Sequence, residues 1–554
     1  MRNKAVTALF LSTLLIISCT GNKTNDILLQ AGKYAFTVAD YNMLKTRMNS
    51  RFLSPKQESN LIDNAYIMAF ALDNRYDTIT LLSKKLMYGM RLYSSEVNGY
   101  VWNKKVKPNL KVSNNDINEA YAKRAVEYTI EFINFPDSVE MNKYCKRGSD
   151  FDTEKGFYAL KRHVSAIPDI TSSVLQSVYP FYPFGVYADK IYNAQKGDVL
   201  GPIEMSSGYF LLHVADIRTI RQPSYNNEKS IIKQELLNVI AEKYIMQSQN
   251  AILGMAKPQM HDKAILYMAS KFDNKTRQWQ GVDENRILMN YQFKGKMRFF
   301  TAGDLEEFIN CEPISIGSPS KANDIKEMMQ NFLMDIYLYE EAKNMKAGAD
   351  PEFMAFKRYY RNKLFIQHYY DQYIYPKMKI TPAEAQQYYN QNKNNQKGFE
   401  SAMVAIYKFR DRKSAFNGLG VIYNYCRQNN RNPASPGLQL SMLPGILSVN
   451  KQVVIHVSDT TNNVGLINAI SEANAGQMLM PLKINREFWV VCVLKKIGNA
   501  ILPYKYAELG LERMLLERKT QEALDKQISI LKVKYPLVIN RLKKYMQDTE
   551  KREN

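Results

Sequence analysis

The sequence predicts a helix-rich α+β protein in which one structural module occurs twice. The first observation is a gap-free repeat, because Gly197 and Pro202 recur as Gly476 and Pro481, an offset of 279 positions in both cases. The second is that helix-start signals before and after this stretch recur in the same order. The third is that apolar residues at three- and four-residue spacing follow each repeat, which is typical of amphipathic helices. Each module should contain a strand-helix opening, a block of long helices, a small α+β unit and a closing helix.

Each module opens with a short strand pair and then a helix start. "DILLQAGKYAFTVADYNML" near the N-terminus matches "RILMNYQFKGKMRFFTAGDLEEF" in the second half of the chain. In both segments a threonine precedes an acidic residue by three positions: Thr37 with Asp40 and Thr301 with Asp304. Helical blocks follow, with "NLIDNAYIMAFAL" in the first copy and "IKEMMQNFLMDIYLYEEAKNM" in the second.

A further helix start precedes each repeated stretch. "KVSNNDINEAYAK" matches "KITPAEAQQYYNQ", and each carries a hydroxyl residue three positions before an acidic one. This is the spacing of a capping box: Ser113 with Asp116 and Thr381 with Glu384. Tyr121 and Tyr389 then fall on the same face of the two predicted helices. The closing helices begin just after Pro223 and Pro503.

The N-terminal residues predict export and lipid attachment. Arg2 and Lys4 precede an apolar run from Ala5 to Ile17. That run is too short to span a bilayer comfortably, since a spanning helix takes about 20 residues. Cys19 follows closely, and "IISC" resembles the lipobox in which a lipid-modified cysteine becomes the mature N-terminus. The alternative is an ordinary signal peptide that happens to contain a cysteine.

The charge balance restricts the class of partner. The formal net charge is +21, from 75 basic and 54 acidic residues. In an exported protein this favours anionic lipid headgroups or acidic unfolded polypeptides over nucleic acid, for which no zinc-finger, RRM or basic-zipper pattern occurs. The alternative is that the charge merely keeps the protein soluble.

The cysteines and histidines do not indicate a metal site. The five histidines are scattered, and we predict no metal and no cofactor. Four cysteines beyond Cys19 are far apart and read as small core residues rather than a disulfide framework: Cys145, Cys311, Cys426 and Cys492.

The order of elements resembles that of the SurA/PpiC-like periplasmic prolyl isomerases. Their parvulin-type isomerase unit ends in "pGevsgPv.t.yGyHiikv". "KGDVLGPIEMSSGYFLLHVADI", from Lys196, follows this ending closely, and "AGQMLMPLKINREFWVVCVLKKI", from Ala475, follows it more loosely. The resemblance implies two parvulin-like units, each preceded by a helical chaperone-like segment. It also implies that the double turn returns the last strand to the middle of a small antiparallel sheet, whose surface forms a peptide groove.

The catalytic residues of that family are missing. Active parvulins resemble one another in two facing histidines, one on the first sheet strand and one after Gly-Tyr on the last. Here Phe210 and Trp489 hold the last-strand place, and "AVEYTIEFINF" and "SAMVAIYKF" contain no histidine. His213 is three residues past Phe210, so it should lie on the opposite face, as a partly exposed strand histidine. We assign no catalytic residue, and the candidate peptide groove contains four aromatic residues: Tyr209, Phe210, Phe488 and Trp489.

The resemblance and the repeat together suggest boundaries along the chain. In order, they are a lipoprotein signal peptide (1–18), a tether (19–26), an N-terminal strand-helix chaperone segment (27–110), a first parvulin-like unit (111–220), a first closing helix (221–258), a second helical chaperone segment (259–378), a second parvulin-like unit (379–499), a closing helix and strand (500–546) and a loose polar tail (547–554).

Three classes of function remain open. The first is a periplasmic chaperone, anchored by its lipid to the outer membrane, that binds unfolded outer-membrane or secreted proteins. The second is an active prolyl isomerase, which the missing histidines oppose. The third is a scaffold subunit of an outer-membrane assembly complex. The 37 tyrosines and 26 methionines would suit an adaptable binding surface, although the same residues are common in the cores of long helices.

Overall fold

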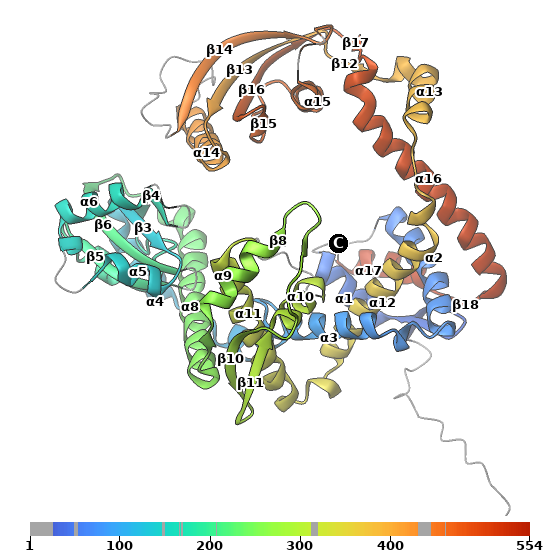
Figure 1. Cartoon of the computed structure of the whole chain (residues 1–554), viewed down its shortest axis with the longest axis horizontal. Helices are drawn as coiled ribbons and strands as arrows, with labels where there is room; N and C mark the ends of the chain where they lie inside the picture. Colours follow the sequence, from blue (N-terminus) through green and yellow to red (C-terminus); the bar gives the residue numbers. More distant parts are fainter. Residues whose placement is uncertain are drawn as a thin grey trace, which may run out of the picture. The chain divides into compact units, whose positions relative to one another are not determined.

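The computed structural model describes residues 26–48, 54–146, 150–165, 167, 170–205, 208–311, 319–429, 445–459, 461 and 463–553 (Figure 1). Long helices accompany small antiparallel sheets, so the predicted helix-rich α+β class is confirmed. The chain forms two compact units. One comprises Met1–Leu61, Ala71–Phe365 and Val538–Asn554, and the other comprises Ile62–Phe70 and Ile366–Leu537.

The first copy of the module begins with a hairpin and ends with a long helix. Its elements are β1 (Ile27–Ala31), β2 (Tyr34–Thr37), α1 (Val38–Met48), α2 (Pro55–Asp73), α3 (Thr80–Ser95), α4 (Asn114–Ala122), β3 (Val126–Phe135), α5 (Ser138–Tyr144), α6 (Glu154–Val164), β4 (Thr171–Val178), α7 (Ala188–Tyr192), β5 (Val199–Met205), β6 (Gly208–Thr219) and α8 (Tyr225–Ala256).

The second copy has the same order of main elements, but α14 stands where the first copy has α5 and α6, and α9, α17 and a few short strands are additional. Its elements are β7 (Gln259–Met260), α9 (Asp262–Lys271), β8 (Phe272–Asp273), β9 (Gln278–Trp279), β10 (Ile287–Phe293), β11 (Lys296–Thr301), α10 (Ala302–Cys311), α11 (Ala322–Asn344), α12 (Pro351–Tyr373), α13 (Pro382–Asn392), β12 (Lys397–Gly398), β13 (Ser401–Phe409), α14 (Arg412–Asn429), β14 (Ile446–His456), α15 (Val464–Glu472), β15 (Leu482–Ile484), β16 (Glu487–Ile497), β17 (Ala500–Ile501), α16 (Tyr504–Lys534), β18 (Leu537–Asn540) and α17 (Leu542–Glu553).

The two four-stranded sheets have the same strand order. It is β4-β3-β6-β5 in the first copy and β14-β13-β16-β15 in the second. The last long strand, β6 or β16, is therefore an inner strand, as the double turn implied. The first turn has the same hydrogen bond in both copies: the N–H of Gly197 donates to Val214 at 2.8 Å, and that of Gly476 to Val493 at 2.7 Å. Both glycines have a positive φ, 95° and 87°, which favours this residue type.

The helix before each sheet is joined to the closing helix in the same way. The hydroxyl of Tyr121 donates to the carbonyl of Pro223 at 2.8 Å, and the hydroxyl of Tyr389 donates to that of Leu502 at 2.8 Å. Both rings also contact the first residue of the closing helix edge-on. The predicted capping boxes are both formed, at α4 and α13. The repeat is therefore present in the structure as well as in the amino-acid sequence.

The short strand after each long closing helix pairs with an opening hairpin. β7, which follows α8, pairs with β10, and β18, which follows α16, completes the sheet β18-β1-β2. The same backbone hydrogen bond marks both joints, from His261 to Leu288 at 2.9 Å and from Arg541 to Leu28 at 2.7 Å. The compact units therefore do not follow the sequence repeats, since the C-terminal strand returns to the N-terminal hairpin.

The C-terminal residues differ from the loose polar tail that the sequence suggested. Residues 547–553 continue α17. Leu542 at its start is fully buried, and Tyr545 contacts Tyr41 of α1 edge-on with ring centroids 5.4 Å apart. The two apolar side chains are three positions apart and so share one face of the helix. This face anchors a segment whose composition alone is polar.

Candidate functional site

The aromatic residue at the last-strand histidine place of the first copy belongs to a packed core. Phe210 is 7 % exposed and lies on the sheet face covered by α7. Its ring centroid is 5.9 Å from that of Phe132 and 5.3 Å from that of Phe184. Asn134 lies directly across from Phe210 on β3, and its side-chain oxygen is buried without a hydrogen-bond partner in the described part of the chain. No ionisable side chain occupies this place.

His213 and Tyr209 face the other side of the same sheet. His213 has no exposed surface and lies between the rings of Phe157 and Tyr158, with centroid distances of 5.1 Å to each. Its position opposite Phe210 is as predicted, but the expected partial exposure is wrong, because α6 covers this face. Burial lowers the pKa of His213, against the smaller opposing effect of Glu154 at 3.5 Å. The imidazole is therefore a core residue.

The corresponding strand of the second copy has a more open aromatic residue. Trp489 is half-buried against the face covered by α15, and its indole N–H donates to Glu487 at 2.9 Å. The ammonium of Lys408, directly across on β13, lies 4.4 Å from the centre of the indole ring. Phe488 lies on the opposite face, next to α14. A cation over an aromatic face is stabilising, so Lys408 and Glu487 both help to hold the indole ring in place.

The four aromatic residues cannot share one groove within each sheet. Tyr209 and Phe210 are consecutive in β6, and Phe488 and Trp489 are consecutive in β16, so each pair divides between the two faces. The residues at the histidine place, Phe210 and Trp489, lie on equivalent faces. Both copies therefore have an aromatic ring, and no histidine, at this position of four-stranded sheets that share one strand order.

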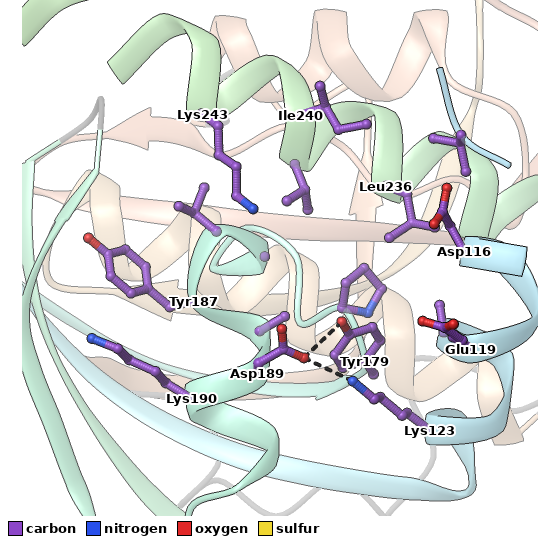
Figure 2. Close-up of a pocket in the computed structure, with 17 residues that line it drawn as sticks. Asp116, Glu119, Lys123, Tyr179, Tyr187, Asp189, Lys190, Leu236, Ile240 and Lys243 are labelled. Atoms are coloured by element: carbon purple, nitrogen blue, oxygen red, sulfur yellow. Dashed lines mark hydrogen bonds and ion pairs between the residues drawn. The ribbon is translucent and has the colours of Figure 1, made fainter. Parts of the chain in front are cut away.

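A crevice lies beside the first sheet, between α4, the segment that contains α7, and α8 (Figure 2). Its volume is about 490 Å³. Lys123 donates to Asp189 at 2.9 Å, and the hydroxyl of Tyr179 donates to the same carboxylate at 3.1 Å. The hydrogen bond from Lys123 lowers the pKa of Asp189. The apolar walls come from Val112, Pro180, Val186, Leu236, Val239 and Ile240.

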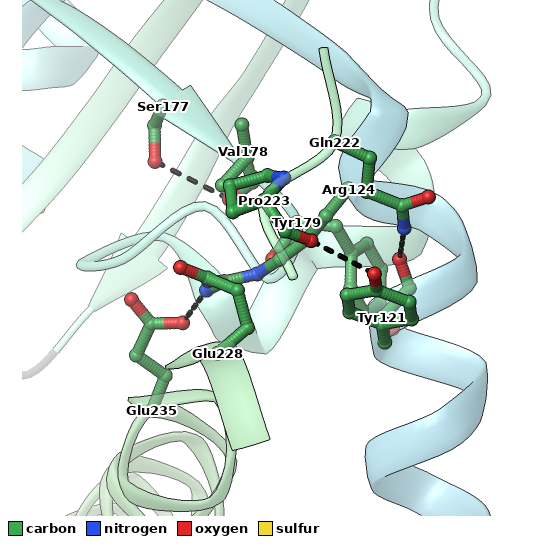
Figure 3. A network of polar contacts seen from close by, with 9 residues as sticks. All are labelled: Tyr121, Arg124, Ser177, Val178, Tyr179, Gln222, Pro223, Glu228 and Glu235. Atoms are coloured by element: carbon green, nitrogen blue, oxygen red, sulfur yellow. Dashed lines mark hydrogen bonds and ion pairs between the residues drawn. The ribbon is translucent and has the colours of Figure 1, made fainter. Parts of the chain in front are cut away.

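A buried arginine fixes the walls of this crevice relative to one another (Figure 3). Arg124 lies between α4 and β3, and its side chain is 4 % exposed. Its guanidinium donates to Glu228 and Glu235 of α8, and its Nε donates to the carbonyl of Tyr179 at 2.8 Å. Burial raises the pKa of Glu235, and Arg124 opposes that shift. The network ties the sheet unit to the closing helix.

Two further hollows lie in the helical part of the same compact unit. The larger, about 1000 Å³, is bordered by α8, α11 and the turn between β10 and β11. The smaller, about 310 Å³, lies among α3, α8, α11 and the π-helical turn Trp102–Val106. Asp335 lines the smaller hollow, is 5 % exposed and accepts a hydrogen bond from Ser95. Burial raises the pKa of Asp335 to about 7.

Sequence reasoning missed Arg124, Asp189 and Asp335. The partners of Arg124 on α8 are 104 and 111 positions away, and no local spacing reveals them. The only sequence signal is a charged residue at the junction of a capped helix and a strand. The spacing of apolar residues in α11 does not reveal that Asp335 is buried, because periodicity marks the apolar positions of a helix and treats every carboxyl as a surface residue.

Several predictions concern residues with little or no structural description. Cys19, the signal peptide and nearly all of the tether lie outside the described residues. Cys145, Cys311 and Cys492 are buried and form no disulfide among the described residues, as predicted, and the side chain of Cys426 is outside the described set. No described helix is both long and apolar enough to cross a membrane. The described side chains also form no cluster of three or more potential metal ligands.

Comparison with known proteins finds similarity at the level of structure. No model of a protein family matches the chain, and no curated protein sequence matches it. Two matching structures are described as the virulence factor PEB4 and the periplasmic protein Cj1289, structurally related SurA-like chaperones of Campylobacter jejuni. The two matches are 15% and 11% identical, cover 43% and 42% of this chain and 95% and 82% of theirs, and have TM-scores of 0.23 and 0.24. PrsA from Bacillus subtilis is 12% identical over 42% of this chain and 88% of its own, with a TM-score of 0.12.

Proposed function

We propose that this chain is a chaperone that binds unfolded outer-membrane or secreted proteins and that its isomerase activity is weak or lost. The observation that carries the proposal is that Phe210 and Trp489 stand at the positions where active parvulins have the last-strand histidine. Phe210 packs against Phe132 and Phe184, so the position lacks the histidine and its space is also filled by an aromatic ring. The sheets, crevice and hollows remain as surfaces for a polypeptide.

Charge and apolar surface would act at different stages of binding. The net charge, +21 for the full chain and +19 once Arg2 and Lys4 leave with the signal peptide, would accelerate encounter with an acidic unfolded chain. Salt screens this attraction beyond about 8 Å at physiological ionic strength. Burial of apolar surface, at about 25 cal/mol per Å², is not screened and would set the lifetime of the complex. Raising the salt concentration should therefore slow capture and leave release nearly unchanged.

The direct test follows aggregation and binding of an unfolded, acidic outer-membrane β-barrel in the presence of the mature chain. Suppressed aggregation, with association rates that fall as salt rises, supports the chaperone. If the chain neither binds the unfolded barrel nor slows its aggregation at low salt, the proposal is wrong. A pull-down of the native protein distinguishes this function from a scaffold. Recovery of one stoichiometric partner, in place of many unfolded precursors, would support a scaffold subunit of an assembly complex.

The proposed location is the periplasmic face of the outer membrane, with Cys19 as the lipid attachment site. The support is the apolar run ending at "IISC". Cys19→Ala should give an unprocessed or soluble precursor in place of a membrane-bound protein. Membrane fractionation and mass spectrometry of parent and variant test this, and identical fractions and masses would refute it.

A further inference from the structure

The hairpin of the second copy has a longer and more open edge than that of the first. β10 and β11 contain seven and six residues, against five and four in β1 and β2. β11 is the outer strand of its sheet, and no described strand pairs with its free side. Met297 and Phe299 on β11 are 48 % and 53 % exposed. By strand register Phe299 corresponds to Ala35, so the second copy has a large apolar side chain where the first has a small one.

The hairpin geometry shows which backbone groups face the free edge. Lys294 and Gly295 form a two-residue turn with positive φ at both positions, and Phe293 pairs with Lys296 across it. In an antiparallel pair that closes in this way, hydrogen-bonded and non-hydrogen-bonded residue pairs alternate along the strands. Met297 and Phe299 therefore point their N–H and C=O groups away from β10.

The opposite strand agrees with this alternation. Gln292 is the cross-strand partner of Met297, so its backbone groups should point away from β11. Its carbonyl does accept a hydrogen bond on that side, from the hydroxyl of Tyr337 at 2.6 Å. The residues whose backbone groups face outward on β11 are thus the same two whose apolar side chains are exposed.

We propose that β11 binds an extended, acidic segment of an unfolded client as an added β-strand. This inference rests on the proposed chaperone function and names how one part of the client is held. Added strands gain affinity from main-chain hydrogen bonds and selectivity from alternate side chains. Lys296 and Arg298 alternate with the two apolar residues and form no ion pair in the described part of the chain, so they favour carboxylates on the incoming strand.

The same charges disfavour a second copy of this chain as the occupant. Pairing of β11 with the β11 of a second copy would bring Lys296 and Arg298 close to the same two cations of that copy. Like charges across a strand pair are destabilising. Charged residues on an edge strand are also a common protection against self-association. The free edge of β11 therefore favours an acidic partner and disfavours pairing with a second copy of this chain.

Amide hydrogen exchange provides the first test. The probe is a short peptide that alternates glutamate with valine, and its control alternates lysine with valine. The acidic peptide at saturation should slow exchange at Met297 and Phe299 about tenfold, as one net hydrogen bond implies. Arg298, whose N–H already faces β10, should not change. The basic peptide should give no protection.

Two variants separate backbone pairing from side-chain contact. Met297→Pro removes an outward N–H and leaves the hairpin hydrogen bonds in place, since proline is tolerated where the missing donor faces solvent. Met297→Thr is the matched control, because it keeps the N–H and a good strand former. The dissociation constant for the acidic peptide should rise about tenfold for Met297→Pro and less than about threefold for Met297→Thr. The double variant Lys296→Glu with Arg298→Glu should bind the basic peptide more tightly than the acidic one. An unchanged melting temperature would verify that this variant is folded.

The outcomes distinguish this inference from the function on which it rests. If the parent binds unfolded client but β11 gains no protection and Met297→Pro binds like the parent, the added strand is refuted and the chaperone proposal stands. If the parent binds no unfolded client, both are refuted. If β11 becomes protected with rising protein concentration and no peptide, a second copy is the occupant and the inference is wrong.

Discussion

The carboxylate of Asp40 accepts a hydrogen bond from the Nε of Arg358 at 2.7 Å. The same carboxylate accepts from the hydroxyl and the N–H of Thr37, at 2.8 Å and 3.0 Å, at the start of α1. The helix α12 of the second copy is thereby joined to the opening helix of the first, within one compact unit. Asp304, the repeat counterpart of Asp40, makes the equivalent bonds to Thr301 but is exposed and forms no ion pair in the described part of the chain.

This difference predicts unequal effects of the same substitution. Asp40→Asn should lower the free energy of unfolding by about 2–3 kcal/mol, because a charge-assisted bond to a partly buried arginine is lost. Asp304→Asn should cost about 1 kcal/mol or less, as only the helix start is weakened. The midpoints of urea unfolding of both variants provide the comparison. Equal losses would show that the bond to Arg358 does not stabilise this joint.

Substitution of Phe210 should affect stability and not restore catalysis. Phe210→Ala removes a ring from a packed cluster and should cost about 3–5 kcal/mol. Tyr182→Ala, at an exposed aromatic residue of the same sheet unit, should change stability by less than about 0.5 kcal/mol. Phe210→His should give no prolyl isomerase activity in a protease-coupled assay, because the facing strand also lacks a histidine. Activity comparable to that of an active parvulin would contradict the assignment of this place.

Removal of Arg124 should loosen the crevice. Arg124→Met leaves Glu228 and Glu235 facing each other without their shared cation and should cost about 3 kcal/mol. Arg218→Met, which breaks an exposed pair with Glu127, is the matched control and should cost less than about 1 kcal/mol. Thermal melting of the two variants tests this. A small effect of Arg124→Met would mean that the apolar contacts of α8 hold the walls without the network.

Asp335 should make stability depend on pH. Its pKa is raised by burial to about 7 from 3.8, so the folded state retains the proton over this interval while the unfolded state releases it. The contribution of the protonated group is fully present below pH 3.8 and is lost as pH rises through about 7. Asp335→Asn keeps an acceptor for Ser95 and cannot ionise. The melting temperature of the variant minus that of the parent should therefore rise between about pH 4 and about pH 7 and level off above pH 7. Parallel profiles would contradict the shift.

Local signals in the sequence predicted the repeated parts of the fold. The two capping boxes, the glycine turns at Gly197 and Gly476, and the helices after Pro223 and Pro503 all form as expected, because each depends on residues close together in the chain. The opposite orientation of Phe210 and His213 also followed from the two-residue period of a strand. The family resemblance supplied the inner position of the last strand.

Contacts between distant segments could not be predicted in this way. The pairing of β18 with β1, the burial of Leu542 in α17 and the full burial of His213 under α6 depend on which surfaces meet after folding. The groove assignment failed for a different reason, because consecutive strand residues were grouped and must face opposite sides. The open edge of β11 became recognisable only when its hairpin could be compared with that of the first copy.

The central claim is that the chain binds unfolded polypeptide and that its prolyl isomerase activity is weak or lost. The most direct measurement is the refolding rate of an acidic test protein whose folding is limited by proline isomerisation, which takes tens to hundreds of seconds unaided. Increasing amounts of the mature chain should slow refolding or lower its yield, in proportion to the amount of complex formed. Acceleration of refolding by amounts well below stoichiometric would show a working isomerase and contradict the account.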